Sequence, residues 1–130
     1  MHPVTSGHNV KILLVEDNED IREGLTDLLE SEGYSVAGSG SAEEGLARLR
    51  AESFQLVITD YMLPGENGRW LLEQAAREQR LRGMSAVMIT AHPQVRPPEG
   101  VRLMHKPLDI DDFLRMVVES LTARQPALSG

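Results

Sequence analysis

Residues 56–68 limit the folds open to this chain more than any other part of the sequence. A run of apolar and β-branched residues leads directly into Asp60, and a Pro-Gly pair and an Asn-Gly pair follow it. A short apolar run that ends in turn residues is typical of a buried strand. The sequence therefore predicts a buried strand with Asp60 at its carboxyl end, which is where open α/β sheets bind their ligands.

Further apolar runs predict strands that alternate with helices. Strands are expected over residues 10–15, 35–38, 86–91 and 101–107. Helices are expected after a cap at Asn18 to about Gly33, after a cap at Ser41 to about Glu52, from about Arg69 to near Gly83, and after a cap at Asp109 through Leu121. This alternation predicts an α/β fold, a doubly wound five-stranded parallel sheet with helices on both faces.

The composition favours one domain of ordinary character. With 130 residues, we expect a flexible leader over residues 1–9, a folded domain over 10–124 and a flexible tail over 125–130. No apolar run is long enough to cross a membrane, and the first ten residues do not resemble a signal peptide. The absence of cysteine excludes disulfides and thiolate metal sites and fits a cytoplasmic location. The net charge of −7 argues against direct nucleic-acid binding.

Polar side chains stand where four of the predicted strands end. Glu16 and Asp17 follow the first strand, Asp60 ends the third, Thr90 lies at the end of the fourth and Lys106 at the end of the fifth. Each group alone has an ordinary explanation, such as an acidic turn, a cap, a β-branched strand residue or a surface lysine. Because parallel strands bring their carboxyl ends to one edge, their joint occurrence favours a shared site.

The chemistry of this set points to phosphoryl transfer. Crowded carboxylates repel one another unless a cation lies among them, and oxygen ligands without histidine or cysteine favour Mg²⁺, Mn²⁺ or Ca²⁺. Lys106 can neutralise an incoming phosphoryl group, and Thr90 can donate to one of its oxygens. A carboxylate such as that of Asp60 can act as the nucleophile and form an aspartyl phosphate.

On these motifs the chain resembles the receiver domain of two-component response regulators, over roughly residues 10–124. The motifs are LLVEDN at 13–18, TDYMLP at 59–64 with Asn67-Gly68, ITA at 89–91, and Lys106-Pro107. The resemblance implies the strand order 2-1-3-4-5 known from a chemotaxis receiver. It implies that Asp60 is the phosphoacceptor, and that Glu16, Asp17, Asp60 and the backbone carbonyl of Met62 hold Mg²⁺, or possible Mn²⁺.

The resemblance also implies how such a protein works. A sensor histidine kinase or a histidine phosphotransfer protein would supply the phosphoryl group, Thr90 would be the switch hydroxyl, and Lys106 would bind phosphate before a strained or cis bond to Pro107. The receiver would catalyse only its own phosphorylation and dephosphorylation and turn over no metabolic substrate. It would signal to an unknown downstream protein by a conformational change or by onward phosphotransfer, as a monomer or weak dimer without nucleic-acid or membrane contact.

Two features depart from the usual receiver pattern. Residues 92–100, where receivers carry a fourth helix, contain three prolines, so we expect that helix to be shortened or replaced by a loop. Leu103 stands where the family usually has an aromatic residue three positions before the lysine. We therefore hypothesise that the loop over 92–100 is itself the switch and becomes ordered when Thr90 engages the phosphate.

Three matters remain open at this stage. A Mg²⁺-dependent phosphohydrolase with Asp60 as nucleophile is an alternative, although the position where such enzymes need a second acid holds Met62. A receiver that serves only for docking is another, although its usual mark is loss of the acid pair, of Asp60 or of Lys106. A stand-alone protein and a segment of a larger regulator are both compatible with the sequence.

Overall fold

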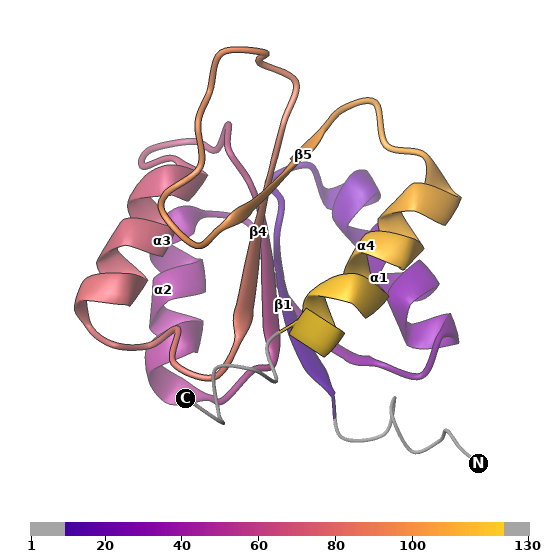
Figure 1. The fold of residues 1–130 in the computed structure, drawn as a ribbon, viewed down its shortest axis with the longest axis horizontal. Helices are drawn as coiled ribbons and strands as arrows, with labels where there is room; N and C mark the ends of the chain where they lie inside the picture. The colour runs from indigo at the N-terminus through magenta and orange to yellow at the C-terminus, as the bar shows by residue number, and fades with distance from the viewer. Residues whose placement is uncertain (1–9, 124–130) are drawn as a thin grey trace.

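Five parallel strands form a central sheet with helices on both faces (Figure 1). The structure is a computed structural model and describes residues 10–123, so the expected leader over 1–9 and tail over 125–130 lie outside the described residues. The elements are β1 (Lys11–Val15), α1 (Glu19–Ser31), β2 (Ser35–Ser39), α2 (Ala42–Ala51), β3 (Leu56–Asp60), α3 (Gly68–Arg77), β4 (Ser85–Thr90), β5 (Arg102–His105) and α4 (Ile110–Ala123). The strand order β2-β1-β3-β4-β5 confirms the predicted doubly wound sheet.

The alternation of side chains along the central strands builds two apolar cores. In β1, Leu13 and Val15 belong to the core on one face, while Ile12 and Leu14 belong to the core on the other. Helices α2 and α3 cover the first face, and α1 and α4 cover the second (Figure 1). Because successive strand residues point to opposite faces, a strand buried on both sides must be apolar throughout.

Side-chain caps start the helices close to the strand ends. The Oδ1 atom of Asn18 accepts from the Ile21 N–H at 2.9 Å, and the Oγ atom of Ser41 accepts from the Glu44 N–H at 3.1 Å. Asp109 caps α4 in the same way. These three caps were predicted, and they fix where each chain segment leaves the functional edge of the sheet. Among residues 10–123, no helix combines the length and apolar character needed to cross a bilayer.

Helix α3 is shorter than predicted. It was expected to continue to near Gly83, but it ends at Arg77. Gln79 has a φ of 60°, and the Arg80 N–H donates to the carbonyl of Ala75 at 2.8 Å, which closes the helix end. This left-handed conformation costs a non-glycine residue about 1 kcal/mol of conformational free energy, so glycine is usual there. Because glutamine stands at this position, the sequence carries no signal for the end of the helix.

The usual fourth helix is replaced by a loop, as predicted. Residues 91–101 between β4 and β5 contain no helix and rise above the sheet edge in Figure 1. The side chain of Val95 packs against the core under α2 and α3, and Leu103 of β5 packs against the same core. The Arg69 guanidinium donates to the Arg96 carbonyl, which ties the loop to the start of α3.

Two glycines offer a direct test of this packing. Gly24 lies within α1 and a methyl group there would meet open space, so Gly24→Ala should raise the free energy of unfolding by about 0.5–1 kcal/mol. A methyl group on Gly68 would lie 2.2 Å from the Asp60 carbonyl oxygen, so Gly68→Ala should lower it by about 1–3 kcal/mol. Urea unfolding of both variants measures the difference, and equal stabilities would contradict the close approach of α3 to the end of β3.

Candidate functional site

The sequence-predicted site residues meet at the carboxyl edge of the sheet. One carboxylate oxygen from each of Glu16, Asp17 and Asp60 lies within 4.8 Å of the other two. The Lys106 ammonium lies 3.1 Å from Oδ2 of Asp60 and forms a hydrogen-bonded ion pair with it. Thr90 ends β4, the strand next to β3. The structure therefore brings residues from four separate segments of the chain to one site.

Burial makes the carboxylates of this site unusual. Glu16 is 5% exposed and Asp60 is 6% exposed, whereas Asp17 is exposed. Burial raises the pKa of Asp60, the hydrogen bond and charge of Lys106 lower it, and the charge of Asp17 raises it. Burial also raises the pKa of Glu16, although the Asn18 N–H that donates to its Oε2 at 3.0 Å acts in the opposite direction. In both cases the net shift is upward, so the folded protein disfavours the two negative charges.

One oxygen of Asp60 fits a metal ligand. While Oδ2 pairs with Lys106, Oδ1 is buried and has no hydrogen-bond partner among residues 10–123. A buried oxygen without a partner is costly, and here two further carboxylates surround it. Three carboxylates without nitrogen or sulfur ligands suit a hard cation such as Mg²⁺ or Mn²⁺. The residues present therefore fit a divalent ion beside Asp60.

The backbone around Asp60 is held by short contacts. The Tyr61 N–H donates to the Ile89 carbonyl at 2.7 Å, and the Thr59 hydroxyl donates to the Asp60 carbonyl at 3.0 Å. The first bond fixes the carboxyl end of β3 against β4, and the second lies within β3 itself. Met62 follows in the loop and is 66% exposed. The predicted metal role concerns its backbone carbonyl alone and stays a prediction.

Arg22 supports the acidic pair, and the sequence analysis did not identify it. Its Nη1 donates to the Glu16 carbonyl at 2.7 Å. The arginine side chain lies against the carboxyl end of β2 and the residue after it, where a Cβ on Gly38 would be 3.1 Å from its Cδ and one on Gly40 would be 3.4 Å from its Nη1. The two glycines leave room for this side chain. In the sequence, these two glycines were the only indication of a role for Arg22. They could be interpreted only once the contact between Arg22 and this distant segment was known.

Thr90 connects the site to the loop over residues 91–101. Its side chain is buried, and Oγ1 accepts from the His92 N–H at 2.9 Å. Its carbonyl accepts from the Lys106 N–H at 2.9 Å, and the bond between Lys106 and Pro107 is cis. The Thr90 hydroxyl only accepts in this bond, so its own hydrogen is available to donate to a group bound at the site. The same hydroxyl can therefore contact both the bound group and the start of the loop.

A pocket of about 280 Å³ opens beside the acidic site. Its walls are mainly aliphatic and come from α1, from the strands and from the connection between β5 and α4. They include Ile21, Leu25, Ile89, Pro107 and Leu108, while Asp60 and Lys106 also border it. An approach to the carboxylate from solvent therefore passes apolar side chains.

Comparison with known proteins agrees with this architecture. The family model of the response regulator receiver domain matches residues 12–117. The response regulator receiver protein CpdR of Brucella abortus is 29% identical over 119 residues, which cover 87% of this chain and 98% of that protein. Several longer relatives match in part, and the chain covers between 23% and 43% of their lengths.

Solved structures show the same fold. A CheY-like receiver domain protein from Methanospirillum hungatei has a TM-score of 0.81 at 31% identity, with 90% of this chain and 97% of that one covered. The response regulator TrrA from Thermotoga maritima, solved in complex with Mg²⁺ and BeF, has a TM-score of 0.75 at 26% identity, with 86% and 98% covered. The chain belongs to the response regulator receiver domain family and is the receiver domain of a two-component response regulator.

The raised pKa values predict how charge affects stability. The folded protein binds protons at Asp60 and Glu16 at higher pH than the unfolded chain does, so these two groups destabilise it above the raised pKa values. This penalty should disappear as the pH falls below the ordinary carboxyl range. At neutral pH without divalent ions, Asp60→Asn should therefore be more stable than the wild type.

Mg²⁺ should reverse this order. At about ten times its Kd it should add about 1.4 kcal/mol to the wild type and less to Asp60→Asn. Asp27→Asn, which removes an exposed acid in the middle of α1, serves as the control. Urea unfolding at several pH values measures these differences, and an Asp60→Asn variant less stable than the wild type in the absence of Mg²⁺ would refute the electrostatic description.

Proposed function

We propose that Asp60 accepts a phosphoryl group from a phosphohistidine on a sensor histidine kinase or a histidine phosphotransfer protein. The observation that carries this proposal is the asymmetric environment of its carboxylate. One oxygen pairs with the Lys106 ammonium, and the other is buried without a partner beside Glu16 and Asp17. Within the acidic cluster, Asp60 is thus the carboxylate that forms an ion pair with Lys106 and also lies beside the other two carboxylates.

The transfer needs little covalent chemistry from the protein. One carboxylate oxygen of Asp60 attacks phosphorus, the bond from phosphorus to the imidazole nitrogen breaks, and the electron pair returns to the imidazole, which then takes a proton from solvent. Lys106 offsets the negative charge of the phosphoryl oxygens, and the Thr90 hydroxyl donates to one of them. Attack of water on phosphorus later returns the free carboxylate and inorganic phosphate.

Mg²⁺, or Mn²⁺, would be held by Glu16, Asp17, Asp60 and the backbone carbonyl of Met62. When bound, the ion neutralises the crowded carboxylates and the phosphoryl oxygens. The Mg²⁺ and BeF complex of TrrA supports this assignment, since beryllium fluoride has the shape and charge of a phosphoryl group. Arg22 contributes indirectly, because its bond to the Glu16 carbonyl orients the acidic pair.

The output of the domain involves the loop over residues 92–100. The His92 N–H donates to the Thr90 hydroxyl, so a movement of this hydroxyl toward the phosphoryl group pulls on the start of the loop. The state of the loop is then read by a downstream protein, or the phosphoryl group is passed on to another histidine. We place this activity in the cytoplasm, with the chain acting as a monomer or weak dimer and without direct binding of nucleic acid or membrane.

Phosphorylation can be tested with a small phosphodonor, Mg²⁺ and intact mass spectrometry. We expect a single phosphoryl adduct on the wild type, none on Asp60→Asn, and at least about tenfold slower formation on Lys106→Ala, because the ammonium no longer offsets the phosphoryl charge. The Asp27→Asn variant should match the wild type. An undiminished adduct on Asp60→Asn would place the acceptor elsewhere, and many turnovers of a generic phosphomonoester would identify a phosphohydrolase instead.

Amide hydrogen exchange tests the role of the loop. Binding of Mg²⁺ and beryllium fluoride should slow exchange over residues 92–100 relative to the protein with Mg²⁺ alone, because Thr90 then links the loop to the bound group. Thr90→Val, which lacks the hydroxyl, should lose this difference, and Thr90→Ser should keep it. Equal protection of the wild-type loop in both states would exclude the loop as the switch.

A further inference from the structure

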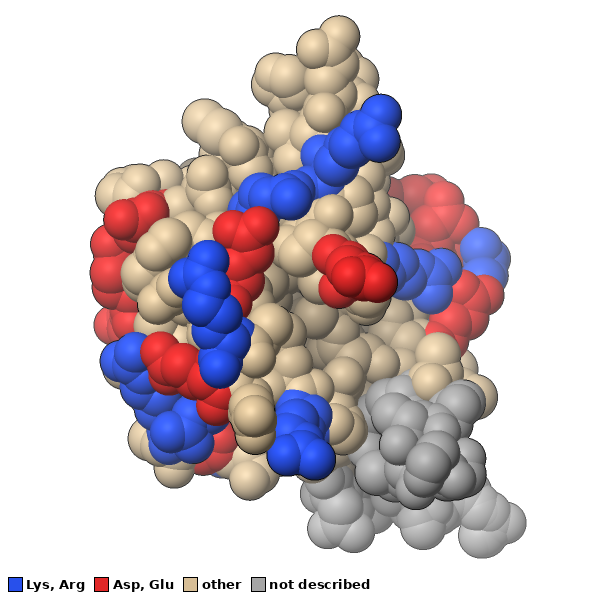
Figure 2. Space-filling model, turned by 60° about the vertical axis from the view of Figure 1, so that its left-hand side comes forward, with Lys and Arg blue, Asp and Glu red and all other residues tan. Residues whose placement is uncertain are grey.

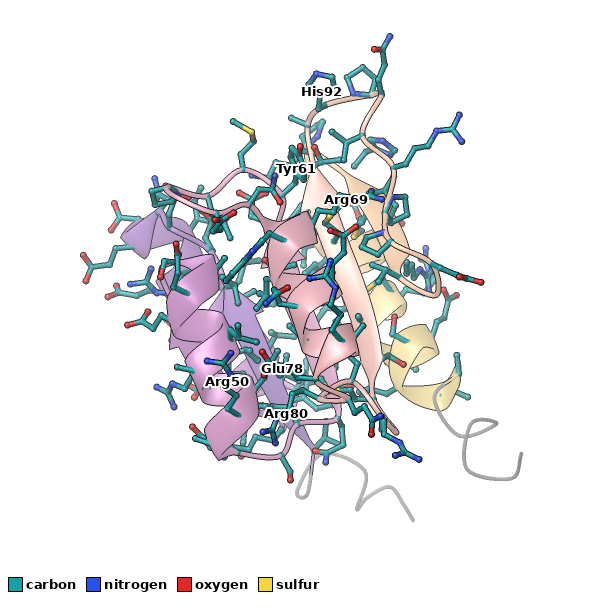
Figure 3. All side chains as sticks on the ribbon, turned by 90° about the vertical axis from the view of Figure 1, so that its left-hand side faces the viewer. Arg50, Tyr61, Arg69, Glu78, Arg80 and His92 are labelled. Atoms are coloured by element: carbon teal, nitrogen blue, oxygen red, sulfur yellow. The ribbon has the colours of Figure 1, made fainter. Side chains whose placement is uncertain are left out.

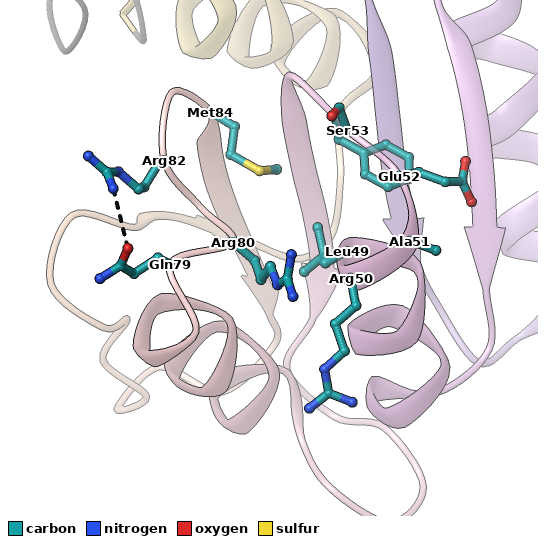
Figure 4. A pocket seen from close by; sticks show the side chains of 10 residues that line it. Leu49, Arg50, Ala51, Glu52, Ser53, Gln79, Arg80, Arg82 and Met84 are labelled. Carbon is teal, nitrogen blue, oxygen red and sulfur yellow. Dashed lines mark hydrogen bonds between the residues drawn. The ribbon is translucent and has the colours of Figure 1, made fainter.

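A second pocket lies at the opposite edge of the sheet from Asp60. It has a volume of about 320 Å³ and is formed by the carboxyl end of α2, the connection from α2 to β3 and the connection from α3 to β4 (Figure 4). In Figure 3, Arg50, Glu78 and Arg80 lie at one end of the molecule, while Tyr61 and His92 lie at the other. Nothing in the proposed phosphoryl transfer uses this pocket.

Three arginines line the pocket, and they are incompletely neutralised. Arg50 forms two hydrogen bonds with Glu78, at 2.8 and 2.6 Å, and the same carboxylate lies 4.0 Å from Nε of Arg80. Arg82 has no ion pair among residues 10–123, and its guanidinium donates to Oε1 of Gln79 at 3.3 Å. One carboxylate therefore serves two guanidinium groups, and the third guanidinium has none.

The surroundings add positive charge to this region. Glu52, the acidic residue that lines the pocket itself, is paired with Lys11 at 2.5 Å and with Arg48 at 2.8 Å. Five basic side chains thus meet two acids in a chain whose net charge is −7. Figure 2, which views the molecule from the side of α2 and α3, shows basic and acidic side chains intermixed at the lower left of this face and one further basic side chain at its lower edge.

A backbone bond fixes Arg80, and a side-chain bond holds Arg82. The end of α3 is closed by bonds from the Gln79 N–H to the Ala76 carbonyl, at 3.0 Å, and from the Arg80 N–H to the Ala75 carbonyl, at 2.8 Å. Glycine is the usual residue at the left-handed position that Gln79 occupies. The glutamine side chain instead holds Arg82, as the dashed line in Figure 4 shows. Gln79, although unfavourable for this backbone conformation, thus holds the side chain of Arg82, whose guanidinium lies on the far side of Arg80 from Arg50 in Figure 4.

We propose that this pocket binds a small phosphate-bearing anion, with Arg80 and Arg82 as its ligands and Arg50 as a further contact. Guanidinium groups match phosphate oxygens with paired hydrogen bonds, and they keep their charge at any physiological pH. The volume lies at the lower end of the range for small-ligand sites, which fits a pyrophosphate-sized group. Binding here is independent of phosphorylation at Asp60 and gives the receiver a second input.

The proposal is tested by calorimetry and by ¹H–¹⁵N NMR with pyrophosphate and with ADP as probes, in low salt and with EDTA to remove divalent ions. We expect saturable binding with chemical-shift changes at residues 50 and 79–82. Arg80→Gln and Arg82→Gln should each weaken binding about tenfold, because each removes a charge-assisted contact. Glu78→Gln should tighten it, because Arg50 and Arg80 lose their competing carboxylate.

The two probes identify the part of the ligand that is recognised. Equal affinities for pyrophosphate and ADP would show that phosphate alone is recognised, and tighter binding of ADP would show that the nucleoside contributes.

Two further variants separate a local effect from loss of the fold or of overall charge. Gln79→Gly should raise the urea midpoint, because glycine suits the left-handed position, and yet weaken binding, because Arg82 loses its partner. Arg115→Gln removes an exposed arginine of α4 outside the pocket and should leave binding unchanged. The proposal would be overturned if millimolar pyrophosphate or ADP did not bind, or if the chemical-shift changes were confined to residues 16, 17, 60 and 106. It would also be overturned if Arg115→Gln lost as much affinity as the pocket variants, or if a hexaglutamate peptide bound more tightly than pyrophosphate.

Discussion

The two oxygens of the Asp60 carboxylate have different surroundings, since one is paired with a lysine ammonium and the other has no hydrogen-bond partner among residues 10–123. Its Oδ2 meets the Lys106 ammonium at 3.1 Å, whereas its Oδ1 is buried without a partner next to two more carboxylates. In isolation this arrangement is unfavourable, because burial and like charge both oppose ionisation. The arrangement persists because β3 is packed between β1 and β4 with apolar cores on both faces. The sheet thus stores an electrostatic cost that a divalent ion, bound as proposed above, would relieve.

The rest of the fold can be understood as support for this one carboxylate. Helix caps at Asn18 and Asp109 turn the chain away from the edge immediately after β1 and β5, which leaves the strand ends open to ligands. Gly68 lets α3 begin directly against the Asp60 carbonyl, and Arg22 holds the backbone of Glu16 from the other side. The loop over residues 92–100 takes the place of a helix and is tied to both Thr90 and α3. In the proposed function, the Thr90 hydroxyl is the point that joins the chemistry to the output.

Features that depend on local chemistry were predictable from the sequence, and features that depend on distant contacts were not. The strands, three helix caps and the loop with three prolines follow from short-range patterns, and the site residues follow because parallel strands share one edge. The end of α3 was missed, since Gln79 adopts a conformation usual for glycine. Arg22 was missed because its role requires the space above Gly38 and Gly40, which are remote in sequence. The family comparison confirmed the class of the domain, while the roles of single residues rest on their geometry.

The affinity for Mg²⁺ tests most directly whether a cation binds at the unpaired oxygen of Asp60. Calorimetric titration should compare the wild type with Asp17→Asn, which removes one carboxylate of the cluster, and with Asp20→Asn, which removes a nearby exposed acid outside it. We expect Asp17→Asn to weaken Mg²⁺ binding by about tenfold or more and Asp20→Asn to change it little. An unchanged Kd in Asp17→Asn, or equal losses in both variants, would show that this acidic cluster is not the cation site.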